Sequence, residues 1–138
     1  MMSLLMEIII TQWALDSYLD LKSKNVFSDS EFNRIMKPDG LLLLKYPHHP
    51  KFNNNKFWSP AQDKNGVIIP DGYKMKWHNV GNGKVQLRLP VGIINGVAFL
   101  CQAYVKSDDK IEKLKLAKFK DHLKLIRLNR HVVKGRLI

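Results

Sequence analysis

Residues 73–110 constrain the fold most, because they contain three strand-like runs separated by turn residues. In the first run Lys74 and Lys76 stand two positions apart, so in a strand both point to one face while their aromatic and apolar neighbours point to the other. In the second run, residues 84–91, basic or polar residues again alternate with apolar ones. This alternation predicts strands with one apolar face and one basic face.

Two turn signals separate these runs. Residues 81–83 have the sequence Gly-Asn-Gly, and Asn95-Gly96 is a favoured two-residue hairpin turn because both residues accept a positive φ. The next run, residues 97–105, is almost continuously apolar, which is typical of a central strand. We therefore expect an antiparallel meander of three strands.

The charge of the chain is uneven and points to a polyanionic partner. Its 138 residues carry a formal net charge of +11, and the sequence pI is about 9.8. Residues 1–45 contain five basic and six acidic residues, whereas residues 46–138 contain eighteen and six. This asymmetry favours nucleic acid over a membrane as the partner, and a purely solubilising surface charge is the alternative.

Length and composition predict one globular domain over residues 1–138, with a cytoplasmic location. The first ten residues are mostly apolar, but Glu7 interrupts them and no basic segment precedes them. We therefore expect a buried first strand over residues 6–10, and neither a signal peptide nor a membrane span. Cys101 is the single cysteine, so no internal disulfide is possible, in agreement with a reducing compartment.

Helical patterns follow the first strand. Residues 11–25 have apolar residues at helical spacing, and Ser28 with Glu31 forms a capping box that begins a second helix between two phenylalanines. Proline cannot continue a helix, so we expect the second helix to stop near Pro38. This helical hairpin should cover one face of the sheet, and residues 41–46 are consistent with either a short strand or a turn.

The remaining segments are a loop, a helix and a tail. Residues 47–72 contain four prolines and predict a packed loop excursion. Residues 107–128 begin with a hydroxyl and two carboxylates, which favour a helix N-terminus, and continue as a lysine-rich helix. Residues 131–138 are interpreted as an arm. The apolar stripe of the helix should contain Ile111, Leu114, Ala117 or Lys118, Phe119, Leu123, Leu125 and Ile126.

The order of strand, two helices and basic meander closed by a helix resembles the RelE/ParE-like superfamily of small bacterial toxins. Its RelE, HigB and YafO branches cleave mRNA on the ribosome. The specific likeness is local: the sequence Tyr-Lys-Met-Lys at residues 73–76 precedes a glycine turn and a strand that opens with Lys84, and residues 99–126 resemble the last strand and closing helix. Over residues 1–46 only the order of elements agrees. The resemblance implies an α+β fold with a small antiparallel sheet, an N-terminal helical hairpin and a C-terminal basic helix.

The resemblance also implies a function. It implies the toxin of a type II toxin–antitoxin system, a metal-free and cofactor-free endoribonuclease that acts on ribosome-bound mRNA and is held inactive by an acidic antitoxin. Lys74 and Lys76 match its paired strand cations, one of which is a candidate base, and Lys84 or Arg88 matches the arginine that holds the scissile phosphate. His78, just beyond the Lys76 strand, is a local candidate for the general acid. Residues expected to bind RNA phosphates around them are Lys106, Lys110, Lys113, Lys120 and Arg127. The chain departs from the family in having lysine at position 84 and no obvious tyrosine in the closing helix.

Several alternatives remain open from the sequence. The same basic face would also serve a non-catalytic RNA- or DNA-binding module, and the same superfamily contains gyrase-directed toxins. His48 and His49 lie between two prolines, but no third ligand stands at a metal-binding spacing, so no metal site is expected. Trp58 and Trp77 are suited to base stacking, although core packing is the more common role of such residues.

Overall fold

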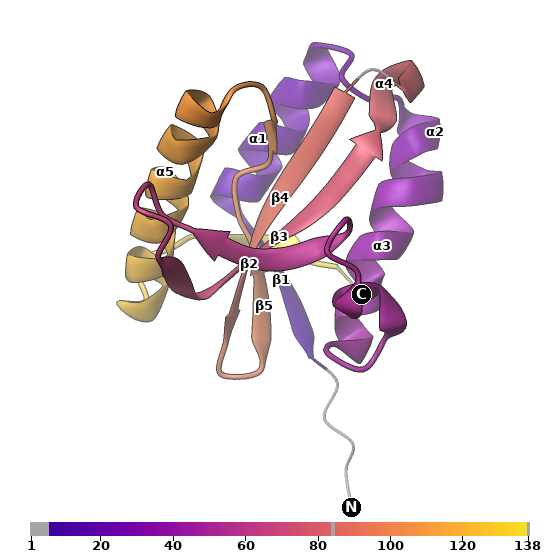
Figure 1. Ribbon diagram of the computed structural model, residues 1–138. Coiled ribbons are helices and arrows are strands. Elements are labelled where there is room, and N and C mark those ends of the chain that lie inside the picture. Colours follow the sequence, from indigo (N-terminus) through magenta and orange to yellow (C-terminus); the bar gives the residue numbers. More distant parts are fainter. Residues whose placement is uncertain (1–5, 84, 138) are drawn as a thin grey trace, which may run out of the picture.

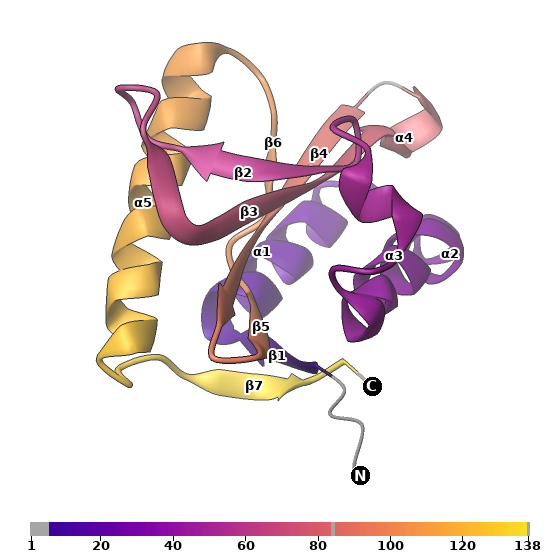
Figure 2. The same cartoon turned by 60° about the horizontal axis from the view of Figure 1, so that its bottom comes forward.

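The alternating segments of the sequence form a sheet of seven strands in the computed structural model, which describes residues 6–83 and 85–137 (Figure 1). The strands are β1 (Glu7–Thr11), β2 (Trp58–Gln62), β3 (Ile68–Asn79), β4 (Val85–Ile94), β5 (Val97–Leu100), β6 (Tyr104–Val105) and β7 (Val133–Arg136). Their order is β2–β3–β4–β5–β1–β7, with β6 also paired to β4. The strands β2 and β7 therefore lie at opposite edges (Figure 2).

The predicted meander is confirmed, because β3, β4 and β5 pair antiparallel in that order. The short helix α4 (Val80–Gly83) joins β3 to β4, and Asn95 and Gly96 form the β4–β5 turn with φ of 52° and 75°. The long apolar run is not one strand, however. It leaves the sheet after β5, where the backbone N–H of Ala103 donates to Ser17 Oγ at 2.9 Å, and then returns as β6.

The first expected strand is β1, and it is parallel to β5, so the sheet is mixed rather than purely antiparallel. The tail forms β7, which pairs antiparallel with β1, and is therefore a strand of the sheet instead of the expected arm. The strand β5 forms hydrogen bonds with one edge of β1, and β7 forms them with the backbone N–H and C=O groups of the other edge. The coarse expectation of an α+β fold is thus confirmed, with a larger sheet than expected.

Helices cover one face of the sheet after β1. They are α1 (Gln12–Ser23), α2 (Asp29–Glu31), the π-helical turn η1 (Phe32–Met36), α3 (Lys37–Leu41) and the 3₁₀ helix η2 (Leu42–Lys45). The predicted capping box is confirmed, since Ser28 Oγ accepts the N–H of Glu31 and a Glu31 carboxylate oxygen accepts the N–H of Ser28, both at 3.1 Å.

The predicted helix stop at Pro38 is wrong. Pro38 lies in the first turn of α3, directly after the π-helical turn η1, where the hydrogen-bond spacing of the helical path changes and a proline can be accommodated. The helical path therefore continues through α3 and η2 to Lys45, so residues 41–45 are helical and do not form a strand. The expected helical hairpin therefore consists of α1 and of a second helical segment in which α2, η1, α3 and η2 follow one another.

Residues 47–72 are more regular than the expected loop excursion. They contain the 3₁₀ helix η3 (Pro50–Asn53), all of β2 and the beginning of β3. Pro60 is compatible with β2 because this strand lies at the sheet edge, where a missing N–H need not break a ladder.

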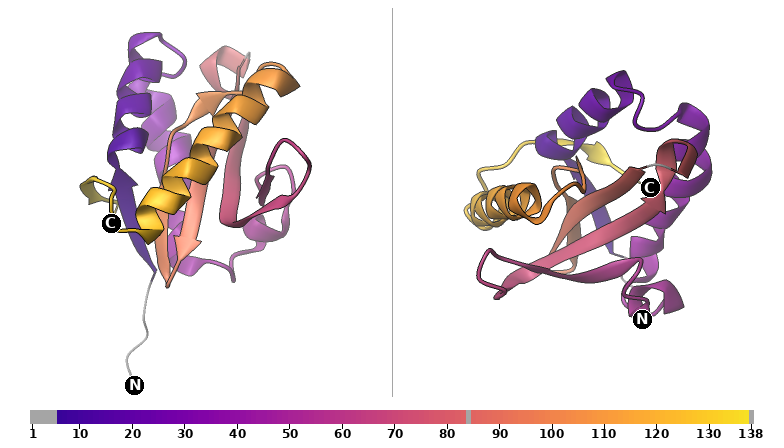
Figure 3. Two further views of the ribbon diagram at one scale, coloured as in Figure 1. Left: turned by 90° about the vertical axis from the view of Figure 1, so that its left-hand side faces the viewer. Right: turned by 45° about the horizontal axis from the view of Figure 1, so that its top comes forward.

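The last helix, α5 (Asp109–Arg127), crosses the opposite face of the sheet (Figure 3, left). Its N-cap is Asp108, whose carboxylate accepts the N–H of Ile111 at 2.9 Å. The predicted apolar stripe is wrong in its first half, because Ile111 and Leu114 are exposed, Leu114 to 61%. Its second half is confirmed, because Phe119, Leu123 and Ile126 are buried, and Leu116, which was not predicted, is buried with them.

The core has two parts, one on each face of the sheet. The larger part lies under the N-terminal helices and contains Trp58 and Trp77, so core packing is the role of both tryptophans. Buried Asp39 holds this part together by accepting the Trp77 indole N–H at 2.9 Å and the Lys51 ammonium at 2.7 Å. The smaller part lies under α5 and includes Cys101, whose burial raises the pKa of its thiol. No helix within residues 6–83 and 85–137 is long and apolar enough to cross a membrane.

The helices α1 and α5 meet where Trp13 stacks on His122, with ring centroids 3.9 Å apart. Burial lowers the pKa of His122 to about 4, an effect that Asp121 opposes and Lys118 reinforces. The unfolded chain should titrate this histidine near its ordinary value of 6.5. Between these values the unfolded state binds more protons than the folded state, so stability that is present above about pH 6.5 is lost as the pH falls toward about 4.

We expect acidification from neutral pH to about pH 4 to lower the free energy of unfolding by roughly 1–2 kcal/mol through His122, after allowance for its partial exposure. Urea denaturation across this range measures the effect. His122→Phe keeps a ring against Trp13 but cannot titrate, so its stability should depend less on pH. His48→Phe, at an exposed histidine, is the control. Equal acid sensitivity in His122→Phe and the wild type would contradict this account.

Candidate functional site

One face of the sheet brings together cations from β3, from β4 and from the residue after β6. Lys76 lies opposite Arg88 in the β3–β4 pair, and Arg88 lies opposite Tyr104 in the β4–β6 pair. Lys74 is two residues before Lys76 and therefore shares its face. Lys106, two residues after Tyr104, is held beside β4 by a backbone hydrogen bond of 2.8 Å. We call Lys74, Lys76, Arg88 and Lys106 the basic cluster.

The helix α5 adds a carboxylate to this cluster. Glu112 Oε2 accepts a hydrogen bond from the Tyr104 hydroxyl at 2.8 Å, and Oε1 lies 3.7 Å from Lys74 Nζ. The Lys74 and Glu112 side chains are only 15% and 14% exposed, so their interaction is less screened than that of a surface pair. Neither Glu112 nor Tyr104 is among the site residues predicted from the sequence. A usable signal existed only for Tyr104, which stands two positions before Lys106.

Burial and mutual repulsion lower the pKa values of the two lysines of β3. Burial lowers the pKa of Lys74; Glu112 opposes this shift, and Arg88 and Lys106 reinforce it. The pKa of Lys76 is lowered by burial first and then by Lys74 and Arg88. Both lysines are therefore closer than ordinary lysines to releasing a proton near neutral pH, which is the property required for proton transfer. Burial also lowers the pKa of Arg88, and burial together with Glu112 raises that of Tyr104.

Arg88 lies beneath the other cations. Its residue is 4% exposed, and its guanidinium donates to the carbonyl oxygen of Leu87 at 3.2 Å, to that of Trp77 at 3.5 Å, and to the Gln86 side chain at 2.9 Å. A bidentate contact between Arg88 and a phosphate, as expected from the sequence, requires some of these bonds to be exchanged. In the observed arrangement Arg88 acts on the cluster through its charge.

Two of the predicted site residues, Lys76 of the basic cluster and His78, lie toward the end of β3. Lys76 Nζ donates to the carbonyl oxygen of Asn55 at 2.8 Å, and a ring nitrogen of His78 contacts the carbonyl oxygen of Lys56. His78 is exposed and lies on the same face as Lys76, at the margin of the cluster. Lys84, the other candidate from the sequence, lies outside the described residues.

The predicted RNA-binding residues of α5 fall into two groups. Lys110 and Lys113 are exposed on its first turns, and Lys113 lines a groove of about 510 Å³ together with Lys74 and Glu112. This groove lies between the N-terminal half of α5 and the segments of β2 and β3. A polyanion bound at the basic cluster would pass close to Lys110 and Lys113, whose positive charges would attract its phosphates.

Lys120 and Arg127 lie further along α5 and have acidic partners. Lys120 Nζ is 3.8 Å from Asp63, in the loop between β2 and β3, and Arg127 Nη2 is 3.2 Å from Asp71 in β3. Arg127 also donates to the carbonyl oxygen of Pro70 at 2.9 Å. Both residues therefore attach α5 to the sheet, and the structure does not bring them into the basic cluster.

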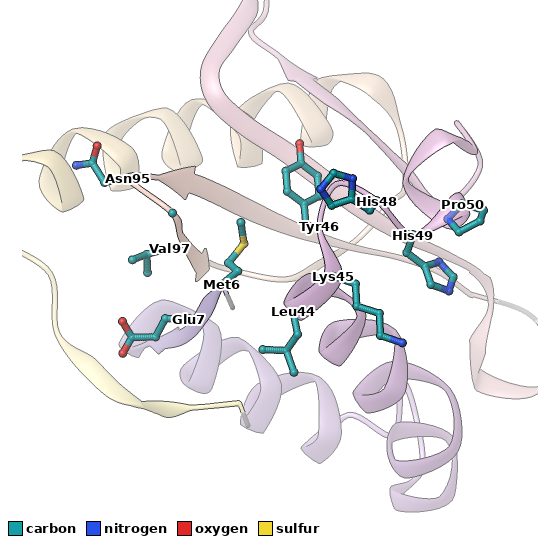
Figure 4. Close-up of a pocket in the computed structure, with 11 residues that line it drawn as sticks. Met6, Glu7, Leu44, Lys45, Tyr46, His48, His49, Pro50, Asn95 and Val97 are labelled. Atoms are coloured by element: carbon teal, nitrogen blue, oxygen red, sulfur yellow. The ribbon is translucent and has the colours of Figure 1, made fainter. Parts of the chain in front are cut away.

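A cleft of about 830 Å³ lies elsewhere and shares no residue with the basic cluster. Figure 4 shows its lining, which includes Tyr46, His48 and His49 together with Met6 and Glu7. The ring of His49 is used locally, since its Nδ1 accepts the backbone N–H of Lys51 at 3.2 Å. Within residues 6–83 and 85–137, no group of three or more His, Cys, Asp and Glu side chains is arranged to hold a metal ion.

The chemistry of the basic cluster suits a phosphodiester substrate. Lys74, Lys76 and Lys106 supply positive charge at partly buried positions, where it acts more strongly on a phosphate than in water. The lowered lysine pKa values favour proton transfer, and the Glu112 carboxylate is a proton acceptor beside them. No protein-family model, no curated protein and no solved structure matches this chain.

Proposed function

We propose that this chain is a metal-independent endoribonuclease that cleaves mRNA on the ribosome, as the toxin of a type II toxin–antitoxin system with a RelE-like arrangement. The observation that carries the proposal is the basic cluster, in which four cations from three segments of the chain share one sheet face with a carboxylate. A face that only kept the protein soluble would not need partly buried lysines with lowered pKa values.

RNA supplies its own nucleophile, which reduces what the protein must provide. The 2′-hydroxyl has to lose a proton, the negative charge that develops on the phosphate has to be stabilised, and the departing 5′-oxygen has to gain a proton. Lys74, Lys76 and Lys106 are suited to the second and third tasks, and Arg88 adds its charge from below. The products are a 2′,3′-cyclic phosphate and a 5′-hydroxyl end.

The ribosome and an acidic antitoxin are the proposed partners. The net charge of +11 and the exposed Lys110 and Lys113 beside the groove favour association with ribosomal RNA and with an acidic protein segment. An antitoxin that covers the basic cluster would neutralise it and exclude RNA in the same step.

Induced expression of the wild-type chain in bacteria tests the proposal, with growth followed and mRNA 5′ ends mapped. We expect growth arrest together with new 5′-hydroxyl ends inside coding regions. Arrest without new ends would contradict the nuclease proposal and favour a gyrase-directed toxin. Absence of arrest would favour a nucleic-acid-binding module, which is the second candidate because Arg88 is buried and already bonded to the protein.

A further inference from the structure

Glu112 is the feature of the basic cluster that phosphate binding alone does not explain. A carboxylate repels phosphate, yet this one lies 3.7 Å from Lys74 Nζ and lines the same groove as Lys74. It is also fixed in place, because the Tyr104 hydroxyl donates to Oε2 at 2.8 Å. A site that only bound RNA would be improved by an uncharged residue at this position.

We propose that Glu112 is a catalytic residue, which accepts the proton of the RNA 2′-hydroxyl at Oε1 while Tyr104 holds Oε2. This inference rests on the proposed endoribonuclease function. An ionised carboxylate can accept a proton directly, whereas Lys74 must first lose its own. Lys74 is then free to remain charged and to stabilise the phosphate, so the two members of the ion pair have different tasks.

The proposed step is balanced without any further reactant. The proton of the 2′-hydroxyl passes to Glu112, the 2′-oxygen forms a bond to phosphorus, and the bond from phosphorus to the 5′-oxygen breaks with its electron pair on that oxygen. A charged lysine of the cluster, Lys76 or Lys106, gives the 5′-oxygen a proton. Exchange with water afterwards returns Glu112 and the lysine to their starting forms.

Glu112→Gln tests the assignment, because the amide keeps the shape and can still accept the Tyr104 hydrogen bond but is not a base. With defined mRNA on purified ribosomes, we expect kcat to fall about 10²–10⁴-fold, the usual contribution of general acid–base catalysis. Binding to ribosomes that carry mRNA with a 2′-deoxy substitution at the cleavage position should be unchanged or tighter, since a negative charge is removed. A carboxylate base loses its function when it is protonated, so we expect the wild-type rate to fall at low pH and this acid limb to be absent from Glu112→Gln.

Asp109→Asn is the matched control, because it removes a carboxylate that lines the same groove on the same helix. It should leave kcat and its pH profile close to those of the wild type. Glu112→Asp provides a second test that retains a carboxylate, and it should keep the acid limb of the pH profile at a reduced rate. Thermal unfolding of each variant separates catalysis from stability.

The outcomes distinguish this inference from the proposed function. If the wild type cleaves mRNA and Glu112→Gln cleaves it equally well or faster, Glu112 is not the proton acceptor, while the nuclease proposal stands. If Glu112→Gln and Glu112→Asp lose activity only in proportion to lost stability, the role of Glu112 is structural and the inference fails. If the wild type does not cleave mRNA at all, both proposals fail together.

Discussion

Alanine at both Lys74 and Lys76 should lower the rate of mRNA cleavage by about 10³-fold or more and abolish growth arrest. The two lysines are neighbours on one face of β3, and both have lowered pKa values because they are buried beside other cations. Their removal takes away charge that stabilises the phosphate and a proton donor for the 5′-oxygen. Cleavage of defined mRNA on purified ribosomes gives the rate, and growth after induction gives the effect in cells.

The double variant Lys22→Ala/Lys24→Ala is the matched control for this experiment. It removes two lysines at the same spacing and gives the same net charge, but these lysines are exposed near the end of α1 and pair with Asp29 and Asp20. Exposed pairs contribute little to stability, so the control should cleave mRNA at close to the wild-type rate. Equal loss in both double variants would mean that net charge matters and the position on β3 does not.

Stability also has to be measured for the β3 variant. Lys74 pairs with Glu112, and Lys76 donates to a backbone oxygen of Asn55, so alanine removes contacts as well as charge. Removal of partly buried like charges should offset much of that loss, and we expect the midpoint of urea denaturation to change little. Full cleavage by a folded Lys74→Ala/Lys76→Ala protein would exclude the proposed site.

The parts of the fold that follow local rules could be predicted from the sequence. The capping box of Ser28 and Glu31 and the turn at Asn95-Gly96 are decided by residues within a few positions of each other. The meander of β3, β4 and β5 followed from alternation between such turns. Local patterns do not predict a strand whose formation depends on a partner far away in the sequence. This is the case for β7, which pairs with β1 at the other end of the chain.

Two predictions about helices were wrong, the stop at Pro38 and the first half of the apolar stripe of α5. In both cases the surroundings of the helix decide the outcome, and the local sequence does not show them. A proline within a helical pattern suggests a stop, but at Pro38 a π-helical turn ends and a new α-helix begins, so the proline can be accommodated. In α5 the stripe begins at Leu116 rather than at Ile111, because the first turns extend beyond the apolar surface of the sheet. Those first turns place Glu112 over the basic cluster.

The candidate site was predictable only in its strand residues. Alternation predicts that Lys74 and Lys76 share a face, and pairing of antiparallel strands brings Arg88 opposite Lys76. The position of Glu112 depends on how α5 crosses the sheet, which no sequence spacing determines. The burial of Arg88 likewise depends on the neighbours that cover it, and it changes how this residue can act.

Arg88 should show the second large effect, and its size should depend on what replaces it. Arg88→Ala removes three hydrogen bonds and most of the side-chain volume at a position that is 4% exposed. We expect the free energy of unfolding to fall by about 2–4 kcal/mol, from the cavity and from the loss of the buried hydrogen bonds of the guanidinium. Urea denaturation measures this loss, and a change below about 0.5 kcal/mol would contradict the observed burial.

Arg88→Met separates charge from packing. Methionine fills a similar volume without a charge to desolvate, and replacing a buried charged group by an apolar one of similar size is often neutral. We therefore expect its stability to stay within about 1 kcal/mol of the wild type, while mRNA cleavage falls about 10²-fold or more because the charge beneath the cluster is lost. A stable Arg88→Met protein that cleaves at the wild-type rate would show that Arg88 only supports the fold, and the phosphate would then have to be held by Lys74, Lys76 and Lys106 alone.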